Sequence, residues 1–393
     1  MGKPNFDQCT QTRKQTYSEV DTPTFTPLSW SMKEIRKVIP PHLFVRHASK
    51  GLSFLARDIY LAFIFFVSTY QLSYHLDTIA LSNSSVFIVK PLARIGLWCT
   101  YWVLQGFVLT GVWVIGHECG HGAFSAHTWL CDTFGFLLHT LLLTPYFSWK
   151  ISHHRHHMNH ASMENDEPYI PKTRSELAIP VDDEHGMDYE EYFSDTPMYT
   201  LFMLVRQQLF AFPAYLLFNV SSQRRYPKLT NHFNRKNDDP RSLGGTADLQ
   251  WQLSANCVLF TREQRSAVLI SDLGISVMVY ALKQACEAWG IHAAIKYYGI
   301  PWLFVNHWFV MITYLQHTGP MLPHYRNGQW NFQRGAAATM DREFLGFIGR
   351  CRSITEPVFK ALWSIYNTCQ FVEDEGDVVF YQDKQGRASC RAL

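Results

Sequence analysis

The sequence predicts an all-α integral membrane protein with about four transmembrane helices. Of its 393 residues 47% are hydrophobic and 15% aromatic, whereas only 17% are charged. The apolar residues gather in runs of the length that a helix needs to cross a bilayer, about 20 residues. Histidine clusters lie beside two of these runs. These features indicate helices in a bilayer that carry a nitrogen-rich site near its surface.

The strongest candidate span is Ile95–Gly116, an uncharged run of aromatic and aliphatic residues. A charge-free run of this length is unusual in the core of a soluble protein, although buried core helices are the alternative for every such run. Three further spans are expected, two of them weakened by internal charges: Leu52–Leu72, Ala267–Leu282 and Tyr297–Gln316.

Two other apolar stretches are interrupted by a proline or a charge. Trp129–Trp149 contains Pro145, and Tyr199–Val220 contains Arg206 and Pro213. We expect both to lie in the membrane interface or to dip into the bilayer without crossing it.

Basic residues predict the orientation. Residues 1–50 carry eight Lys or Arg, whereas the connector Cys286–His292 carries none. Under the positive-inside rule both termini and the long middle region face the cytosol. We therefore divide the chain into a cytosolic N-terminal segment (1–50), a membrane domain (51–350) and a C-terminal cytosolic tail (351–393).

Composition excludes several classes of protein. The net charge of +2 is small and forms no basic stripe, so no nucleic-acid partner is expected. Nine cysteines are scattered without a Cys-x-x-Cys pair, which argues against a disulfide framework and against a zinc ribbon.

The first histidine cluster is His117-Glu-Cys-Gly-His121, at the predicted cytosolic end of the strongest span. Positions i and i+4 of a helix share a face, so both imidazoles can reach one metal ion. A single pair at this spacing often arises by chance. The pair also matches the His-Glu-x-x-His pattern of zinc metalloproteases, with Glu118 as the general base. That alternative leaves the second cluster unexplained.

The second cluster is His153-His-Arg-His-His157. His153, His156 and His157 are related by i, i+3 and i+4 and share a helix face, whereas His154 points elsewhere. His160 follows one turn later and is a weaker candidate. Five neutral imidazoles near one membrane face form a site suited to iron, copper or zinc.

Five stretches carry a family resemblance. In chain order they are Ile39-Pro-Pro-His42, His117-Glu-Cys-Gly-His-Gly-Ala-Phe-Ser125, Pro145-Tyr-Phe-Ser-Trp-Lys-Ile-Ser-His153, Tyr314-Leu-Gln-His-Thr-Gly-Pro-Met-Leu-Pro-His-Tyr325 and Ala338-Thr-Met-Asp-Arg342. Together they resemble the membrane fatty-acid desaturases of the microsomal Δ12 (oleate) type, from about residue 24 to residue 350.

The resemblance implies a multi-pass helical protein of the endoplasmic reticulum membrane with a cytosolic di-iron centre. It further implies that O2 and electrons from cytochrome b5 and its reductase convert an acyl lipid into a product with a new cis double bond. Closely related enzymes hydroxylate the chain or form an acetylenic bond. The ligands that it implies are His117, His121, His153, His156, His157 and His317.

The chemistry is consistent with that implication. An unactivated methylene has no acidic proton, so general acid–base catalysis cannot attack it. Oxidation of the methylene therefore needs a redox-active metal, and zinc, which is redox-inert, could not serve.

One departure from the family pattern matters. The family has a third box, His-x-x-His-His, soon after the stretch that ends at Arg342, but His324 is the last histidine of this chain. Similarity continues to Arg350 and resumes at Cys369, after only eighteen residues where the family has several tens. Three outcomes are open: a single iron, an impaired desaturase-like protein, or replacement ligands such as His139, His307 or His324.

Overall fold

The computed structural model describes residues 24–27, 29–78, 84–179, 196–224, 226, 230–233, 259–261, 263–340, 357–389 and 391–392. The side chains of residues 84–88 and 391–392 are not described. The junction at Cys351, where an internal loss is predicted, lies outside these residues.

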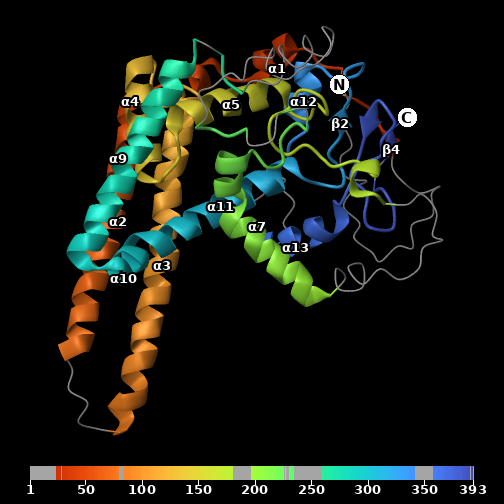
Figure 1. Cartoon of the computed structure of the whole chain (residues 1–393). Helices are drawn as coiled ribbons and strands as arrows, with labels where there is room; N and C mark the ends of the chain where they lie inside the picture. Colours follow the sequence, from red (N-terminus) through yellow and green to blue (C-terminus); the bar gives the residue numbers. More distant parts are fainter. Residues whose placement is uncertain are drawn as a thin grey trace, which may run out of the picture. The chain divides into compact units, whose positions relative to one another are not determined.

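Helices dominate the described residues and confirm the predicted all-α class (Figure 1). The longer helices are α2 (Ala48–Thr78), α3 (Ser84–Gly120), α4 (Thr128–Leu141), α5 (Tyr146–Asn159), α7 (Pro197–Phe218), α9 (Arg265–Trp289), α11 (Ile300–His317) and α13 (Val358–Thr368). The short ones are α1 (Met32–Val38), α10 (Ile291–Ala294), α12 (Phe332–Ala337), the 3-10 turns Pro41–Phe44 and Ser175–Leu177, and the π turn Ile295–Gly299.

Strands are few and two residues long. β1 (Thr24–Phe25) pairs in parallel with β4 (Arg391–Ala392). β2 (His324–Tyr325) pairs antiparallel with β3 (Val378–Val379). These pairs tie together segments that are distant in sequence.

Among the described residues, four helices are long and apolar enough to cross a membrane: α2, the Val89–Gly120 part of α3, α7 and α9. A break that bends the chain by 107° joins α4 to α5, and this pair counts as a fifth span only if both helices belong to one broken span. The expected number of about four is therefore confirmed.

The identity of one span differs from the prediction. Tyr297–Gln316 forms most of α11, which is not among the four helices, whereas Tyr199–Val220 forms most of α7, which is. Polar side chains such as Asn306 and His307 lower the hydropathy of α11, and none of its side chains is exposed. By contrast, α7 exposes large apolar side chains such as Phe202.

Contacts divide the chain into two compact units. Unit 1 comprises residues 1–37, 156–204 and 313–393, and unit 2 comprises residues 38–155 and 205–312. The boundary falls inside α5, α7 and α11. The three-part division at residues 50 and 350 stays a prediction.

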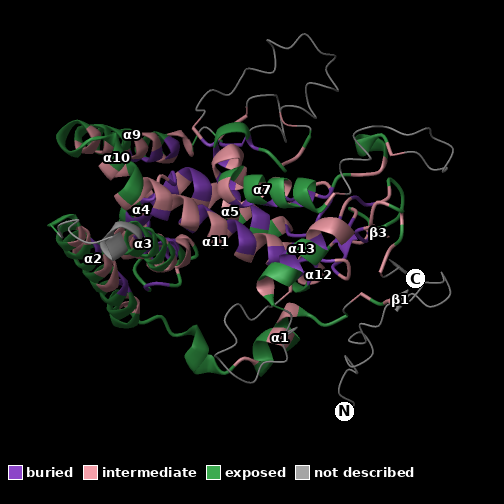
Figure 2. Ribbon diagram, turned by 90° about the horizontal axis from the view of Figure 1, so that it is seen from below, coloured by how far each residue is buried: buried purple, intermediate pink, exposed green. Residues whose placement is uncertain are grey.

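Unit 2 has an apolar core in which Trp113, Leu138, Trp149 and Phe212 are buried. Its outer helices α2 and α9 expose apolar side chains such as Phe63 and Leu273, and Figure 2 shows long exposed stretches along both. Exposed apolar surface on long helices is what a bilayer would cover.

Unit 1 includes the chain beyond the predicted loss. Phe371 and Val372 are fully buried, and the Val372 N–H donates to the carbonyl of Lys172. The Arg174 guanidinium pairs with Glu373 at 2.6 Å. The segment that resumes the family resemblance at Cys369 is therefore packed into the unit that holds residues 156–204.

Close packing of α3 against α11 in unit 2 provides a stability test. A Cβ at Gly106 would lie 2.3 Å from the Cβ of Phe304, whereas a Cβ at Gly96 on the same helix would meet nothing within 4 Å. Gly106→Ala should lower the melting temperature in detergent, because overpacking costs roughly 1–3 kcal/mol. Gly96→Ala should leave it unchanged or raise it, because alanine favours the helix by about 1 kcal/mol. Equal melting temperatures for the two variants would contradict this packing.

Candidate metal centre

The first candidate site lies in unit 2, where the last turn of α3 meets α5. His117 lies in the last turn of α3, His121 is the first residue after that helix, and His153 projects from α5. The Nε2 atom of His153 lies 2.9 Å from that of His117 and 3.2 Å from that of His121, and the latter two are 3.2 Å apart. We call these three residues the first cluster.

The spacing of these nitrogens fits a metal ion. Three nitrogens bound to one ion at about 2.1 Å lie roughly 3.0–3.4 Å from one another. Hydrogen bonds alone do not explain a triangle, because a neutral imidazole has one N–H and one lone-pair nitrogen. A cation at the centre would satisfy all three lone pairs.

The carboxylate of Glu118 orients the imidazole of His117. Glu118 accepts from Nδ1 of His117 at 3.0 Å, which leaves Nε2 to face the cluster. In a zinc protease this glutamate would instead act as the general base on water. His157 continues the predicted face of α5 one turn beyond His153, in the stretch that belongs to unit 1.

The second candidate site lies within unit 1. His156, His160 and His317 have ligand atoms within 4.8 Å of one another. The ring centroids of His160 and His317 are 4.5 Å apart, and those of His156 and His317 are 4.9 Å apart. We call these three residues the second cluster. It is more buried than the first, whose His121 is exposed.

A buried carboxylate supports the second cluster. Asp166 is 3% exposed and accepts from Nδ1 of His156 at 2.6 Å and from the backbone N–H groups of Ala161 and Glu167. A carboxylate behind a ligating histidine fixes its tautomer and directs its other nitrogen to the metal.

Charge and burial favour the ligand forms of these groups. Burial alone raises the pKa of Asp166, but attraction and hydrogen bonds from His156 and His160 outweigh burial and hold that pKa below its usual value. Burial, followed by repulsion from neighbouring histidines, holds the pKa of His317 well below its usual value. His317 is therefore a neutral imidazole, the form that binds metals.

The remaining histidines lie elsewhere. Among the residues that the structure describes, neither cluster includes His139, His307 or His324. His139 is buried and its Nε2 donates to the carbonyl of Trp113. His324 lies in β2, where burial and His160 lower its pKa to about 3.

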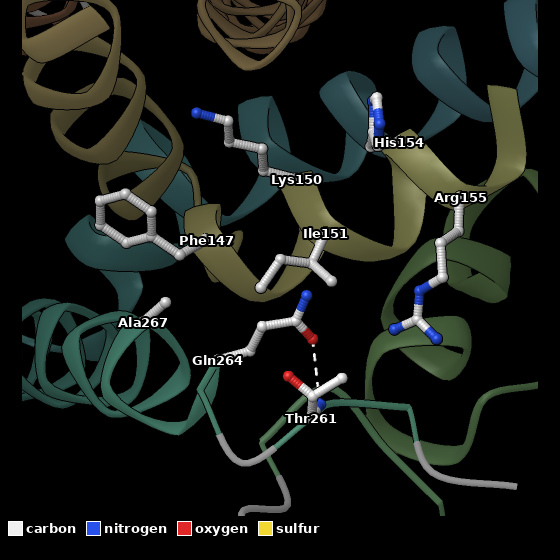
Figure 3. A pocket seen from close by; sticks show the side chains of 8 residues that line it. All are labelled: Phe147, Lys150, Ile151, His154, Arg155, Thr261, Gln264 and Ala267. Atoms are coloured by element: carbon white, nitrogen blue, oxygen red, sulfur yellow. Dashed lines mark hydrogen bonds between the residues drawn. The ribbon is translucent and has the colours of Figure 1, made fainter. Parts of the chain in front are cut away.

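His154 is exposed and lies outside both clusters. It lines a separate pocket of about 430 Å³ between α5 and the start of α9, together with Lys150, Arg155 and Gln264 (Figure 3). Helix α5 thus presents histidines to the clusters and other polar residues to this pocket.

Sequence patterns alone miss part of this arrangement. His160 is i+4 from His156, so its spacing predicts that it lies on the same helix face. It stands outside the His153-His-Arg-His-His157 run, however, so the sequence makes it only a weak candidate for the second cluster. Asp166 lies beyond the helix in Asn-Asp-Glu, a stretch without a recognisable motif. Only the fold brings that carboxylate beneath His156.

Several membrane-length helices and two buried or half-buried histidine clusters define a class: a helical membrane protein with a candidate metal centre. The sequence matches the fatty acid desaturase family over residues 96–347. It is 35% identical over 396 residues to a Δ12 fatty acid desaturase of Mortierella isabellina, covering 90% of each protein. It is 38% identical over 330 residues to the Δ12 fatty acid desaturase of Arabidopsis thaliana, covering 83% of this chain and 75% of that protein.

An oleate hydroxylase of Claviceps purpurea is similar to the same extent, 38% over 329 residues, covering 83% of this chain and 65% of that protein. The chain belongs to the fatty acid desaturase family, whose members are oxidoreductases of lipid metabolism. The predicted family is confirmed.

The buried carboxylate yields a test of the second cluster. Asp166→Asn should lower the affinity of the purified protein for metal roughly 10- to 100-fold at one site, because an amide orients His156 less well. Asp132→Asn is the matched control, since Asp132 is a half-buried carboxylate that pairs with Lys150 in unit 2. Metal titration followed by mass spectrometry measures both. Equal affinities in the two variants would exclude the support role of Asp166.

Proposed function

We propose that this protein is an iron-dependent fatty-acyl desaturase, which introduces a cis double bond into the acyl chain of a membrane lipid. The observation that carries the proposal is the convergence of three imidazole nitrogens from α3 and α5 within 3.2 Å. Family membership and relatives named Δ12 desaturases support the same reaction.

The proposed ligands fall into two sets. The first cluster would hold one iron, and the second cluster would hold the other. His157 is a further ligand that the family resemblance implies. Bound iron would supply the oxidation of an unactivated methylene with O2, which side chains alone cannot perform. The protein supplies neutral imidazoles, a buried carboxylate at Asp166 and apolar helices for the acyl tail.

The sequence has no third histidine box after His324, so other residues would have to supply its ligands to the second cluster. His160 was a weak candidate by spacing, yet it supplies a third imidazole beside His156 and His317. We propose that His160 fills part of the ligand set that the third box would otherwise complete. This favours two irons over a single iron, which is one of the three outcomes left open by the sequence.

The proposed setting is the endoplasmic reticulum membrane, with cytochrome b5 and its reductase as electron donors. An omega-6 fatty acid desaturase of Brassica juncea, 38% identical over 332 residues, is named for the endoplasmic reticulum. Because one relative is an oleate hydroxylase, hydroxylation or acetylenic bond formation at the same site is the closest variant of the proposal.

Expression in a yeast host without Δ12 desaturase, fed with oleate, tests the activity. A dienoic acid should accumulate and be detected by gas chromatography with mass spectrometry. A hydroxylated or acetylenic acid would assign the variant reaction to the same site. No new product from protein that is folded and iron-loaded would contradict the proposal.

Box mutants test the ligands in the same assay. His156→Ala should reduce any product to the level of the empty vector, because it removes a ligand of the second cluster. His154→Ala, two residues away and exposed, should retain activity within about twofold, as is usual for surface positions. Activity in His156→Ala would remove that residue from the site.

A second candidate is a desaturase-like membrane protein with impaired catalysis. The observation that favours it is the lack of any histidine after His324. The third candidate is a membrane zinc metalloprotease built on His117-Glu-Cys-Gly-His121. Metal content of purified protein separates them: about two irons per chain for the desaturase, one or none for the impaired protein, and zinc for the protease.

A further inference from the structure

An aromatic box lies directly behind the first cluster in unit 2. It consists of Trp113 on α3, His139 on α4 and Trp149 on α5, which are at most 3% exposed. The ring of His139 stacks on Trp113 at 4.8 Å and 17°, and Trp149 meets both edge-on at 4.8 and 5.3 Å. Helices α3, α4 and α5 therefore contribute one ring each to the box.

Hydrogen bonds fix the box. Nε2 of His139 donates to the carbonyl of Trp113 at 3.1 Å, and Nε1 of Trp113 donates to Oγ1 of Thr144 at 3.1 Å. These bonds leave the rings little freedom to turn. A buried, hydrogen-bonded aromatic group of this kind sets the rotation of the helices that carry it.

Two glycines let α3 lie against the box. A Cβ at Gly116 would fall 2.3 Å from Cδ2 of His139, and a Cβ at Gly120 would fall 3.0 Å from Cζ3 of Trp149. Both glycines are within the last turns of α3, which also carry His117, and His121 follows directly after the helix. The close approach thus sets where the imidazoles of α3 point.

The face of Trp149 is in contact with a ligand. Its indole stacks on the imidazole of His153 at 4.4 Å and 19°, and its ring centroid is 5.5 Å from that of His117. The stack follows from helix geometry, because residues 149 and 153 are i and i+4 on α5. The carboxylate of Asp166 orients His156 by a hydrogen bond, whereas the indole of Trp149 contacts the face of the His153 ring.

From these contacts we propose that Trp149 is the positioning residue of His153, and that Trp113 and His139 hold Trp149 in place. The inference rests on the proposed metal site. The indole limits rotation of the imidazole, so Nε2 of His153 stays directed at His117 and His121. Groups outside the ligand shell that orient a ligand typically change metal affinity 10- to 100-fold.

Cobalt(II) binding to the purified full-length protein, followed by visible absorption, tests the inference without turnover. His121→Ala identifies the part of the signal that belongs to the first cluster. Trp149→Leu should weaken that part at least about 10-fold, whereas Trp149→Phe, which keeps an aromatic face, should weaken it less. Trp98→Leu is the control, since Trp98 is 6% exposed on α3 and packs on Tyr101 and Tyr297.

The outcomes separate the inference from the function on which it rests. If the wild-type protein shows no first-cluster signal, the proposed metal site itself fails. If wild type binds and Trp149→Leu binds equally well, or Trp98→Leu loses as much affinity, the positioning role is overturned. Should Trp149→Leu not fold, Trp149→Phe should shift the cobalt absorption bands and Trp98→Phe should not. Unshifted bands in Trp149→Phe would then overturn the inference.

Discussion

The approach of α5 to the end of α3 is the constraint on which the candidate centre depends. Imidazoles from two helices meet within 3.2 Å only if both helices hold their rotation about their axes to within about 10–20°. Soft, solvent-exposed contacts could not do this. A stack of buried rings and two glycines lies behind the cluster. Their rigid packing holds the imidazoles in the geometry that a metal ion requires.

The two clusters are supported by different physics. The second cluster uses a buried carboxylate, which both orients His156 and lowers the cost of placing positive charge nearby. The first cluster is half-exposed and uses an aromatic face at His153. Loss of the carboxylate of Asp166 should therefore weaken metal binding at the second cluster, whereas loss of the indole of Trp149 should weaken it at the first.

Much of this arrangement could be predicted from sequence, for identifiable reasons. Apolar runs report long helices directly, because a bilayer selects for hydropathy along the chain. Spacing of i and i+4 grouped His117 with His121, but the same reasoning kept His153 with His156. Spacing could not show that His153 faces the first pair while His156 faces His160 and His317. The choice of α11 rather than α7 as a span differs from the structure, because proline and arginine were given too much weight in α7 and the polar Asn306 and His307 too little in α11. Asp166 and the partners of Trp149 depend on segments brought together only by folding.

Because no histidine follows His324, the candidate ligand set depends on residues that the family pattern does not emphasise. His160 completes a set of three imidazoles, and the segment after Cys369 still packs into unit 1. X-ray absorption at the iron edge of aerobically purified protein tests the central claim most directly. The account predicts iron whose nearest neighbours are nitrogens, with the outer-shell scattering of several imidazoles. Protein that binds no iron, or iron without that imidazole scattering, would contradict it.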